Sequence, residues 1–352
     1  MKLLRFPYLV QQEIMSTMDY QDLFLLSFCS KRVKNLVISS EKSRFKEIET
    51  VKYKLIGRII SIQNSVDETL DNKIVKVMED LFRFNGKSNM ISFKIPMDRI
   101  GKKKYKIVRF PSTIEATLDH ILDIFGQRLD FLVCTYHLSD LRILSKLKNV
   151  KRSTLCLRGE TCANQLDEYF SASPKQKYIQ CNVTLKGELK EDSGFYTTDI
   201  LDIHDHSSLS AGILKHFTGR KAFLRTERLE NSDIIQFVQR WKSGIAHQNL
   251  EMLIVRLDDC CSSFEPNEVK KSIRIENLTK NQPLIPVDRT FTFYSQCWKK
   301  PSFSSLSYVV RETDQHVASV IIEKQKFVFA VWNMTEEHFR WIFERDFKMK
   351  CF

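Results

Sequence analysis

The sequence has little of what marks secreted proteins, membrane proteins and several enzyme classes. Only ten of its 352 residues are glycine, which disfavours a dinucleotide-binding fold with its glycine-rich turn. The nine cysteines include no Cys-x-x-Cys pair, which argues against disulfide scaffolds and zinc ribbons. No window approaches about 18 uninterrupted apolar residues, and the chain start has no signal-peptide core. We therefore expect a soluble intracellular protein, cytoplasmic or nuclear, with no membrane partner.

Motifs for catalysis and metal binding are also sparse. The sequence lacks Gly-x-Ser-x-Gly, and nothing couples a particular cysteine to a particular histidine. The one run with metal-ligand residue types is Asp202-x-His204-Asp205-His206, whose alternate members would share one face of a strand. No other ligand group accompanies this run, so we expect an exposed strand end, no metal and no cofactor. The protein is predicted not to be an enzyme; an enzyme hidden in the later repeat region is one alternative.

Positive charge is in excess, with a formal net charge of +12. Residues 41–110 hold seventeen Lys/Arg and nine Asp/Glu, so most of the excess lies there. The densest run consists of Lys102, Lys103, Lys104, Lys106 and Arg109. The solvated face and turn of a hairpin is the favoured interpretation, and a phosphate-binding strip is the weaker one. A non-catalytic scaffold that binds nucleic acid or a phosphoprotein through residues 52–110 is therefore the alternative function.

Three short helices are predicted between residues 6 and 37. Pro7 suits a first helical turn, Asp19 and Asp22 place carboxylates at the start of the second helix, and Ser30 caps the third. Apolar residues recur at helical spacing, at Val10, Ile14, Met18, Leu23, Leu26, Val33, Leu36 and Val37. Some forty residues bury too little surface to be stable alone, so this segment should dock on another protein or on the following domain.

This N-terminal segment resembles an F-box. The matching positions are Phe6-Pro7 at the opening Leu-Pro, Ile14 at the mid-helix Ile, Asp19 with Asp22-Leu23 at the Leu-Asp-x-x-Asp-Leu turn, and Cys29-Ser30-Lys31-Arg32 at Val-Ser-Lys-Arg. It departs from the pattern at Phe6, Tyr8-Leu9, Thr17-Met18 and Val33. The resemblance implies binding to the Skp-type adaptor of a cullin-based ubiquitin ligase. The residues expected to bind the adaptor are Phe6, Pro7, Leu9, Ile14, Leu23 and Leu26, with Val33 and Leu36 supporting the helical packing. An ordinary N-terminal helical hairpin packed on its own domain is the alternative.

The middle of the chain predicts short strands at residues 51–62, 90–95 and 105–110 and helices at 70–81 and 112–126. From there, short apolar runs recur at steps of roughly 22 to 24 residues, with a last step near 30, and helical patterns lie between most of them. The runs are residues 131–133, 155–157, 179–183, 200–203, 222–224 and 253–255. A strand and a helix repeating at this period are typical of a leucine-rich-repeat-like solenoid. The repeat is degenerate, so a single irregular parallel α/β sheet is the alternative.

A solenoid would present a concave face. If the apolar strand residues point inward, their neighbours on that face are Arg158, Gln180, Asn182, Asp202, His204, Arg225 and Arg256. This set is polar and somewhat basic, which suits an acidic or phosphorylated protein partner. A shift of one residue in register would invert the assignment.

Two later segments resemble the F-box-associated domain of many nematode F-box proteins. The first is a helix over residues 231–244, with Ser232 as its expected cap, Trp241 in the core and Gly244 as its terminator, followed by a strand at residues 249–253. The second comprises strands at 317–322 and 327–332, joined by a four-residue turn, and a helix at 335–347. Its matching positions are Arg311, Asp314, Ala318-Ser319-Val320, Phe327 and Val331-Trp332.

The fold class expected is α/β, with an N-terminal three-helix F-box, a degenerate leucine-rich-repeat-like β/α solenoid, and a C-terminal β-hairpin and helix. The expected regions are the F-box at 1–40, a basic α+β connecting region at 41–110, a β/α repeat region at 111–262, and the C-terminal part of the F-box-associated domain at 263–352. We expect a substrate-recognition subunit of a Skp/cullin/F-box ubiquitin ligase. Its partners would be a Skp-type adaptor, a cullin reached through that adaptor, and an unidentified protein substrate.

Overall fold

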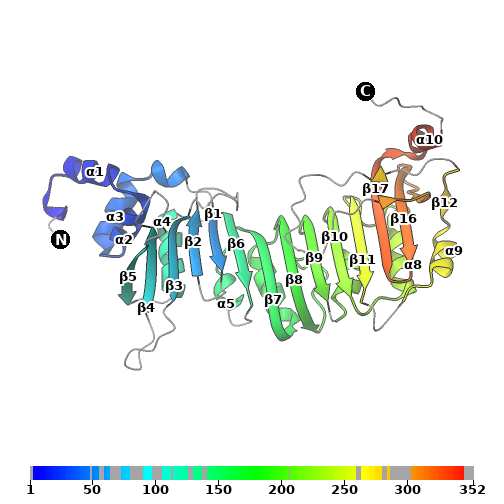
Figure 1. The fold of residues 1–352 in the computed structure, drawn as a ribbon, viewed down its shortest axis with the longest axis horizontal. Helices are drawn as coiled ribbons and strands as arrows, with labels where there is room; N and C mark the ends of the chain where they lie inside the picture. The colour runs from blue at the N-terminus through cyan, green and yellow to red at the C-terminus, as the bar shows by residue number, and fades with distance from the viewer. Residues whose placement is uncertain are drawn as a thin grey trace. The chain divides into compact units, whose positions relative to one another are not determined.

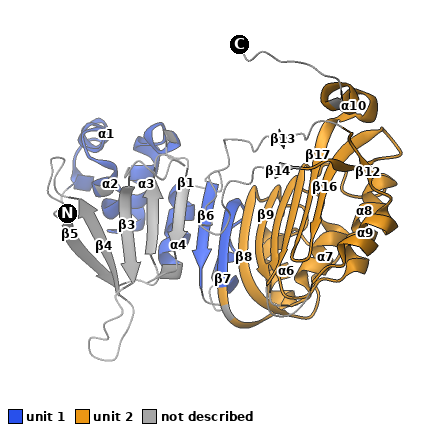
Figure 2. Ribbon diagram, turned by 45° about the vertical axis from the view of Figure 1, so that its right-hand side comes forward, with its two compact units in different colours: residues 1–156 blue, residues 157–352 orange. Residues whose placement is uncertain are grey.

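The computed structural model describes residues 3–47, 50–54, 59–63, 73–79, 90–96, 105–111, 114–125, 130–136, 141–205, 207–258, 263–279, 284–285 and 303–344. The chain divides into two compact units, Met1–Cys156 and Leu157–Phe352 (Figure 2). The first unit carries an N-terminal helical region, and both units contain strands of a mixed α/β region with a large sheet. None of the helices in the described ranges is long and apolar enough to cross a membrane.

Unit 1 begins with a cluster of short helices (Figure 1). These are η1 (Leu3–Arg5), α1 (Tyr8–Ser16), α2 (Tyr20–Ser27), α3 (Lys31–Ser40) and η2 (Arg44–Glu47). The three predicted helices are confirmed: Asp19 precedes α2, and the Ser30 hydroxyl accepts a hydrogen bond from the Val33 N–H at 3.2 Å. Pro7 is the N-cap residue before α1 and does not lie in its first turn. Met15, Leu23 and Val37 are fully buried among these helices, so the cluster has a small core of its own.

The strands of unit 1 follow η2. They are β1 (Thr50–Lys54), β2 (Ile59–Gln63), β3 (Lys73–Glu79), β4 (Met90–Pro96) and β5 (Tyr105–Pro111), each antiparallel to the next. Helix α4 (Ile114–Phe125) comes next, and β6 (Asp130–Thr135) returns to pair in parallel with β1. Then follow α5 (Leu141–Leu144) and β7 (Val150–Cys162), which pairs in parallel with β6 over Val150–Leu155.

The helix expected at residues 70–81 is wrong, because residues 73–79 form strand β3. Ile74, Val75 and Val77 are β-branched, which favours a strand, and β3 has strand partners on both sides. Helical spacing of the apolar residues was therefore coincidental. The helix expected at 112–126 and the strands at 90–95 and 105–110 are confirmed as α4, β4 and β5.

Unit 2 alternates helices and parallel strands before it ends in antiparallel ones. Its first part contains α6 (Ala163–Ala172), β8 (Tyr178–Lys186), β9 (Ile200–Asp205), α7 (Leu209–His216), β10 (Lys221–Thr226), α8 (Asn231–Lys242) and β11 (Met252–Leu257). Strands β8 to β11 pair in parallel, each with the next. All six recurring apolar runs of the sequence are thus strands, β6 to β11, as predicted.

The second part of unit 2 contains α9 (Pro266–Ile273), β12 (Glu276–Asn277), β13 (Leu284–Ile285), β14 (Phe303–Ser304), β15 (Ser307–Val310), β16 (His316–Glu323), β17 (Lys326–Thr335) and α10 (Glu336–Glu344). Strand β17 pairs antiparallel with β11, and β16 pairs antiparallel with β17. Because Glu323 lies opposite Lys326, the hairpin turn has two residues between the strands, and the four-residue turn expected from the sequence is wrong.

The two faces of the unit 2 strands carry different helices. The Phe237 and Trp241 rings of α8 contact the ring of Phe329, with centroids 5.2 and 5.0 Å apart, and Phe329 lies opposite Leu253 of β11. Trp332 lies on the opposite face of β17, where its ring contacts Phe339 of α10 at 5.6 Å. Alternation along the strands therefore decides which side chains pack under α8.

The boundaries of α8 are partly as expected. Gly244 adopts φ +69°, the left-handed conformation typical of a helix terminator, and a Cβ there would meet Thr313. The N-cap is Glu230, not Ser232: the Glu230 N–H donates to the Asp233 carboxylate at 2.9 Å. The helix thus begins one residue before the serine, and Asp233 in its first turn supplies the acceptor.

A buried histidine follows α8. His247 is 4 % exposed, and its Nδ1 lies 2.8 Å from the carbonyl of Phe217. Burial lowers the pKa of His247 to about 4; the Phe217 hydrogen bond opposes this shift, and nearby Arg240 and His216 add to it. The ring is therefore neutral in the folded protein at neutral pH, with Nδ1–H as the donor.

Acid is expected to destabilise unit 2 through His247. As pH falls from about 6.5 towards 4, the unfolded chain binds a proton at this residue and the folded chain does not. The unfolding free energy should therefore fall by about 2–3 kcal/mol over this window. Urea denaturation at pH 7 and pH 4.5 measures it. Asparagine tolerates the φ of 59° at this position, so a His247→Asn variant should show a shallower dependence on pH; an unchanged dependence would contradict the assignment.

Candidate functional site

Large apolar side chains are exposed at the start of the chain. Among the described residues, the exposed large hydrophobics are Leu4, Phe6, Tyr8, Leu9, Val10, Ile245 and Trp341. Five of these seven lie between residues 4 and 10, on η1, α1 and the residues between them, and Leu9 is the most exposed at 77 %. So many exposed apolar side chains within one short stretch make it the candidate for contact with another molecule.

The residues expected to bind an adaptor divide into two groups. Phe6, Pro7 and Leu9 are exposed, and Ile14 is half-buried. Leu23, Leu26, Val33 and Leu36 are all buried in the helical core. Leu23 and Leu26 thus pack the helices in this chain and offer no exposed contact, because α2 turns its apolar side inward. Sequence reasoning missed Leu4, Tyr8 and Val10, which adjoin exposed Phe6 and Leu9 along the chain.

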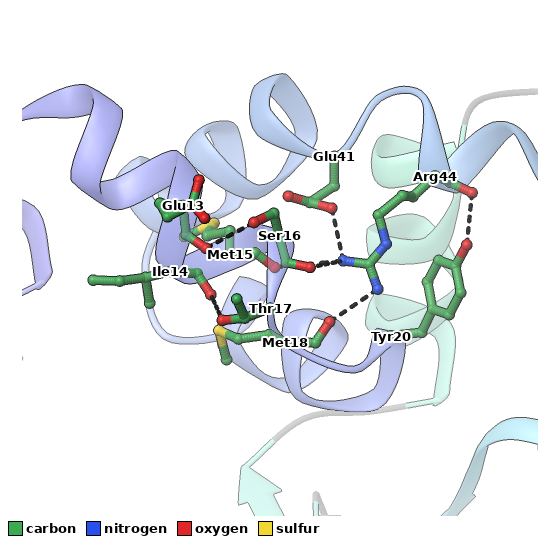
Figure 3. A network of polar contacts seen from close by, with 9 residues as sticks. All are labelled: Glu13, Ile14, Met15, Ser16, Thr17, Met18, Tyr20, Glu41 and Arg44. Carbon is green, nitrogen blue, oxygen red and sulfur yellow. Dashed lines mark hydrogen bonds and ion pairs between the residues drawn. The ribbon is translucent and has the colours of Figure 1, made fainter.

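Arg44 joins the ends of the N-terminal helices (Figure 3). Its Nη1 donates to the carbonyls of Met15 and Ser16 at 3.4 and 3.3 Å and to the Glu41 carboxylate at 2.8 Å, and its Nη2 donates to the carbonyl of Met18 at 2.9 Å. The guanidinium also lies 4.8 Å from the centroid of the Tyr20 ring. One planar side chain therefore adds donors to carbonyls at the end of α1 and just after it, where intrahelical N–H donors run out.

Loss of Arg44 is expected to loosen the helical cluster. Arg44→Ala leaves three carbonyls and the buried Glu41 carboxylate without this donor, so the free energy of unfolding of the helices should drop by about 2 kcal/mol. Lysine keeps the charge but cannot make the forked contacts, so Arg44→Lys should recover less than half of the loss. Hydrogen exchange of α1 amides measures the effect, with exposed Lys42→Ala as the control. Equal protection in all variants would contradict the role.

A second candidate surface lies on the unit 2 strands, on the face opposite α8. Asn182, His204, Arg225 and Arg256 occupy equivalent positions on β8 to β11 and lie directly opposite one another across the parallel pairs. Arg256 in turn lies opposite Lys326 of β17. Hence the register assigned from the sequence places four of its residues in one row. The side chain of Arg158 lies outside the described side chains.

Asp258 links this row. Its carboxylate lies 3.3 Å from Nε2 of His204 and 3.8 Å from Nε of Arg225. Asn182 Nδ2 lies 3.5 Å from Nδ1 of His204, so the contacts continue across three strands. Sequence reasoning missed Asp258, although alternation from Arg256 could have found it. The side chains of His204, Arg225 and Asp258 are partly exposed.

The neighbouring row changes character across the sheet. Gln180 and Asp202 are opposite each other, and the Tyr178 hydroxyl donates to Asp202 at 3.2 Å. On β10 and β11 the same row continues with Phe223 and Ile254, which are buried in an apolar cluster. This second row is therefore polar on β8 and β9 and apolar on β10 and β11, whereas the first row stays polar through Arg225 and Arg256.

The run Asp202 to Asp205 divides between faces and contacts. His204 pairs with Asp258, whereas the Asp205 carboxylate accepts hydrogen bonds from the Ser207 and Ser210 N–H groups, both at 2.8 Å. His206 lies outside the described residues. Within the described parts of the chain, no group of three or more His, Cys, Asp or Glu side chains has the arrangement of a metal site.

A cavity of about 230 Å³ lies beside α7 and α8. Three of the ionisable side chains that line it contact other residues of the lining: Lys215 and His216 lie 3.6 and 3.8 Å from Glu191, and Arg240 donates to the carbonyl of Lys215 at 2.8 Å.

The basic side chains of residues 52–110, predicted as an alternative nucleic-acid strip, lie outside the described side chains.

The arrangement defines a class of protein in which a small helical module with an exposed apolar surface precedes a mixed α/β region with a large sheet. Residues 3–45 match the family model of the F-box domain, and this segment is an F-box domain, as its resemblance implied. F-box domains bind Skp-type adaptors in cullin-based ubiquitin ligases, which suggests an adaptor role in ubiquitination for this chain. No curated protein and no solved structure matches the chain.

Proposed function

We propose that this protein is the substrate-recognition subunit of a Skp/cullin/F-box ubiquitin ligase. The observation that carries the proposal is the exposed apolar surface of residues 4–10 on a segment that matches the F-box domain. Such a subunit performs no chemistry; it supplies proximity by holding a target lysine near the charged ubiquitin-conjugating enzyme. The cullin is reached through the adaptor.

The apolar surface suits a hydrophobic groove on the adaptor. In the chain alone, apolar surface is exposed to water at Leu4, Phe6, Tyr8, Leu9 and Val10. Burial of this surface against a partner is favourable by about 25 cal/mol per Å². The departures of this F-box from the family pattern keep apolar side chains at Phe6 and Leu9. The substitutions are thus compatible with the same mode of binding.

Direct binding tests this function. The full chain and a purified Skp-type adaptor should form a complex at submicromolar affinity, on the order of −8 kcal/mol or more favourable, by titration calorimetry. Co-elution with a cullin should require the adaptor. If the chain forms no complex with any of several Skp-type adaptors from its own organism, the proposal is overturned.

The remainder of the chain is proposed to select the protein target, as the F-box-associated domain that it resembles would. In this proposal β8 to β11 with α7 and α8 are degenerate leucine-rich-repeat-like units, and their face opposite α8 is the recognition surface. The residues proposed for target binding are Arg158, Gln180, Asn182, Asp202, His204, Arg225 and Arg256. Support comes from the shared row of Asn182 to Arg256 and from the half-exposed side chains around Asp258.

An acidic peptide probe is expected to bind this face. Arg225, Arg256 and Lys326 lie on three neighbouring strands about 4.8 Å apart, so they favour a chain of carboxylates or phosphates. A Glu-rich decapeptide should lose about tenfold or more in affinity, measured by fluorescence anisotropy, on Arg225→Glu with Arg256→Glu. Exposed Arg228→Glu is the matched control. Equal loss in the control variant, or preference for a DNA oligonucleotide with steep salt dependence, would contradict this target class.

A further inference from the structure

The helices of the F-box pack on helix α4, which begins almost seventy residues after the F-box match ends. Four segments of the F-box contribute contacts: α2 through Phe24 and Ser27, the residue after α2 through Phe28, α3 through Lys34, and η2 through Phe45. On α4 the partners are His120, Asp123 and Phe125. Helix α4 thus contacts α2, α3 and η2 of the domain.

The centre of this contact is polar and specific. Ser27 Oγ lies 2.7 Å from Nε2 of His120 and donates its own proton to the Phe24 carbonyl at 2.5 Å. Since the hydroxyl has one proton, Nε2 of His120 must carry the hydrogen that joins the two helices. Burial lowers the pKa of His120 to about 4, with Lys34 adding to the shift and Asp123 opposing it, so the ring is neutral at physiological pH.

Aromatic packing surrounds that hydrogen bond. The ring centroids of Phe28 and His120 are 3.8 Å apart, and those of Phe45 and Phe125 are 5.2 Å apart in an edge-to-face arrangement. Leu118 and Ile121 of α4 are fully buried as well. The ion pair between Lys34 and Asp123, at 2.7 Å, lies at the edge, with the Asp123 side chain 60 % exposed, and it adds little.

We propose that α4 is an integral part of the adaptor-binding module and holds the F-box helices in their binding arrangement, with His120 as the positioning residue. The exposed residues 4–10 make none of the contacts to α4 given above, so adaptor and α4 use different surfaces and both can be engaged together. A domain of about forty residues has only a small core of its own, and the contacts with α4 add buried surface to it. The effect on adaptor affinity rests on the proposed function; the support of the helices does not.

The experiment uses the full chain with His120→Ala, which removes the ring against Phe28 and the donor to Ser27. Amides of α2 and α3 should exchange hydrogen about tenfold faster, and adaptor affinity should weaken about five- to thirtyfold, although His120 is remote from residues 4–10 in the sequence. Asp119→Ala, at an exposed position of the same helix, should change neither. His120→Gln, whose amide can replace the Nε2 donor, should recover part of both effects.

Each outcome decides the proposal. Unchanged exchange of α2 and α3 in folded His120→Ala protein overturns it, as does recovery by Gln that is no better than Ala. If His120→Ala fails to fold, the milder Ser27→Ala, which removes the hydroxyl from α2, must show the same faster exchange. Should the wild-type chain bind no Skp-type adaptor, the proposed function fails, and the exchange result alone still decides whether α4 supports these helices.

Discussion

Replacing Leu9 with aspartate is expected to weaken adaptor binding about a hundredfold or more and to leave the unfolding temperature unchanged within about 2 °C. Leu9 is 77 % exposed, so its side chain contributes little to the folded chain. In the complex, a carboxylate at the centre of an apolar contact must lose its water without gaining a partner. Titration calorimetry gives the affinity, and thermal unfolding of the free chain gives the stability.

Two further variants separate binding from folding. Glu13→Ala lies on the same helix and is exposed, so its affinity for the adaptor should match the wild type. Leu23→Ala removes a fully buried side chain and should cost about 2–5 kcal/mol of stability in the helical cluster. If Leu9→Asp binds as tightly as Glu13→Ala, the apolar surface of residues 4–10 is not the adaptor site.

Local signals in the sequence predict most elements of this fold. The Ser30 cap, the carboxylates before and within α2, and the glycine after α8 are local signals, and the structure shows each of them in place. The recurring apolar runs are strands because a short run of buried residues is enough to form a strand when strands pair with it on both sides. What depends only on nearby residues was predictable.

Features that depend on distant parts of the chain were not predictable. The helix expected at 70–81 failed because strands β2 and β4 supply partners that its own spacing could not reveal. Leu23 and Leu26 are expected adaptor contacts by their place in the motif, but their burial depends on packing against helices such as α3, which the motif does not indicate. Likewise the position of His120 beside Ser27 joins residues 93 positions apart, which no local pattern indicates. Contacts between segments distant in the sequence decide the strand at 73–79, the burial of Leu23 and Leu26, and the pairing of His120 with Ser27.

The strongest single stabilising side chain of unit 2 is expected to be Trp241, and Trp241→Ala should lower the free energy of unfolding by about 3–5 kcal/mol. Trp241 is fully buried, its ring meets Phe329 edge-on with centroids 5.0 Å apart, and the guanidinium of Arg311 lies 5.1 Å from its centroid. Arg311 is held there by two hydrogen bonds to Asp314, at 2.8 and 2.6 Å. Removing the indole therefore opens a cavity and uncovers a buried cation.

The pair of replacements at this position tests the cause of the loss. Within the described residues the indole N–H of Trp241 has no hydrogen-bond partner, so Trp241→Phe loses volume without breaking a hydrogen bond and should cost about 1–2 kcal/mol. Trp341→Ala, at a 44 % exposed position on α10, should change stability by less than about 1 kcal/mol. Urea denaturation measures all three. A larger loss of stability for Trp241→Ala than for Trp241→Phe assigns the stability to packing between α8, β17 and Arg311. Equal losses for the two variants would instead assign it to the indole N–H.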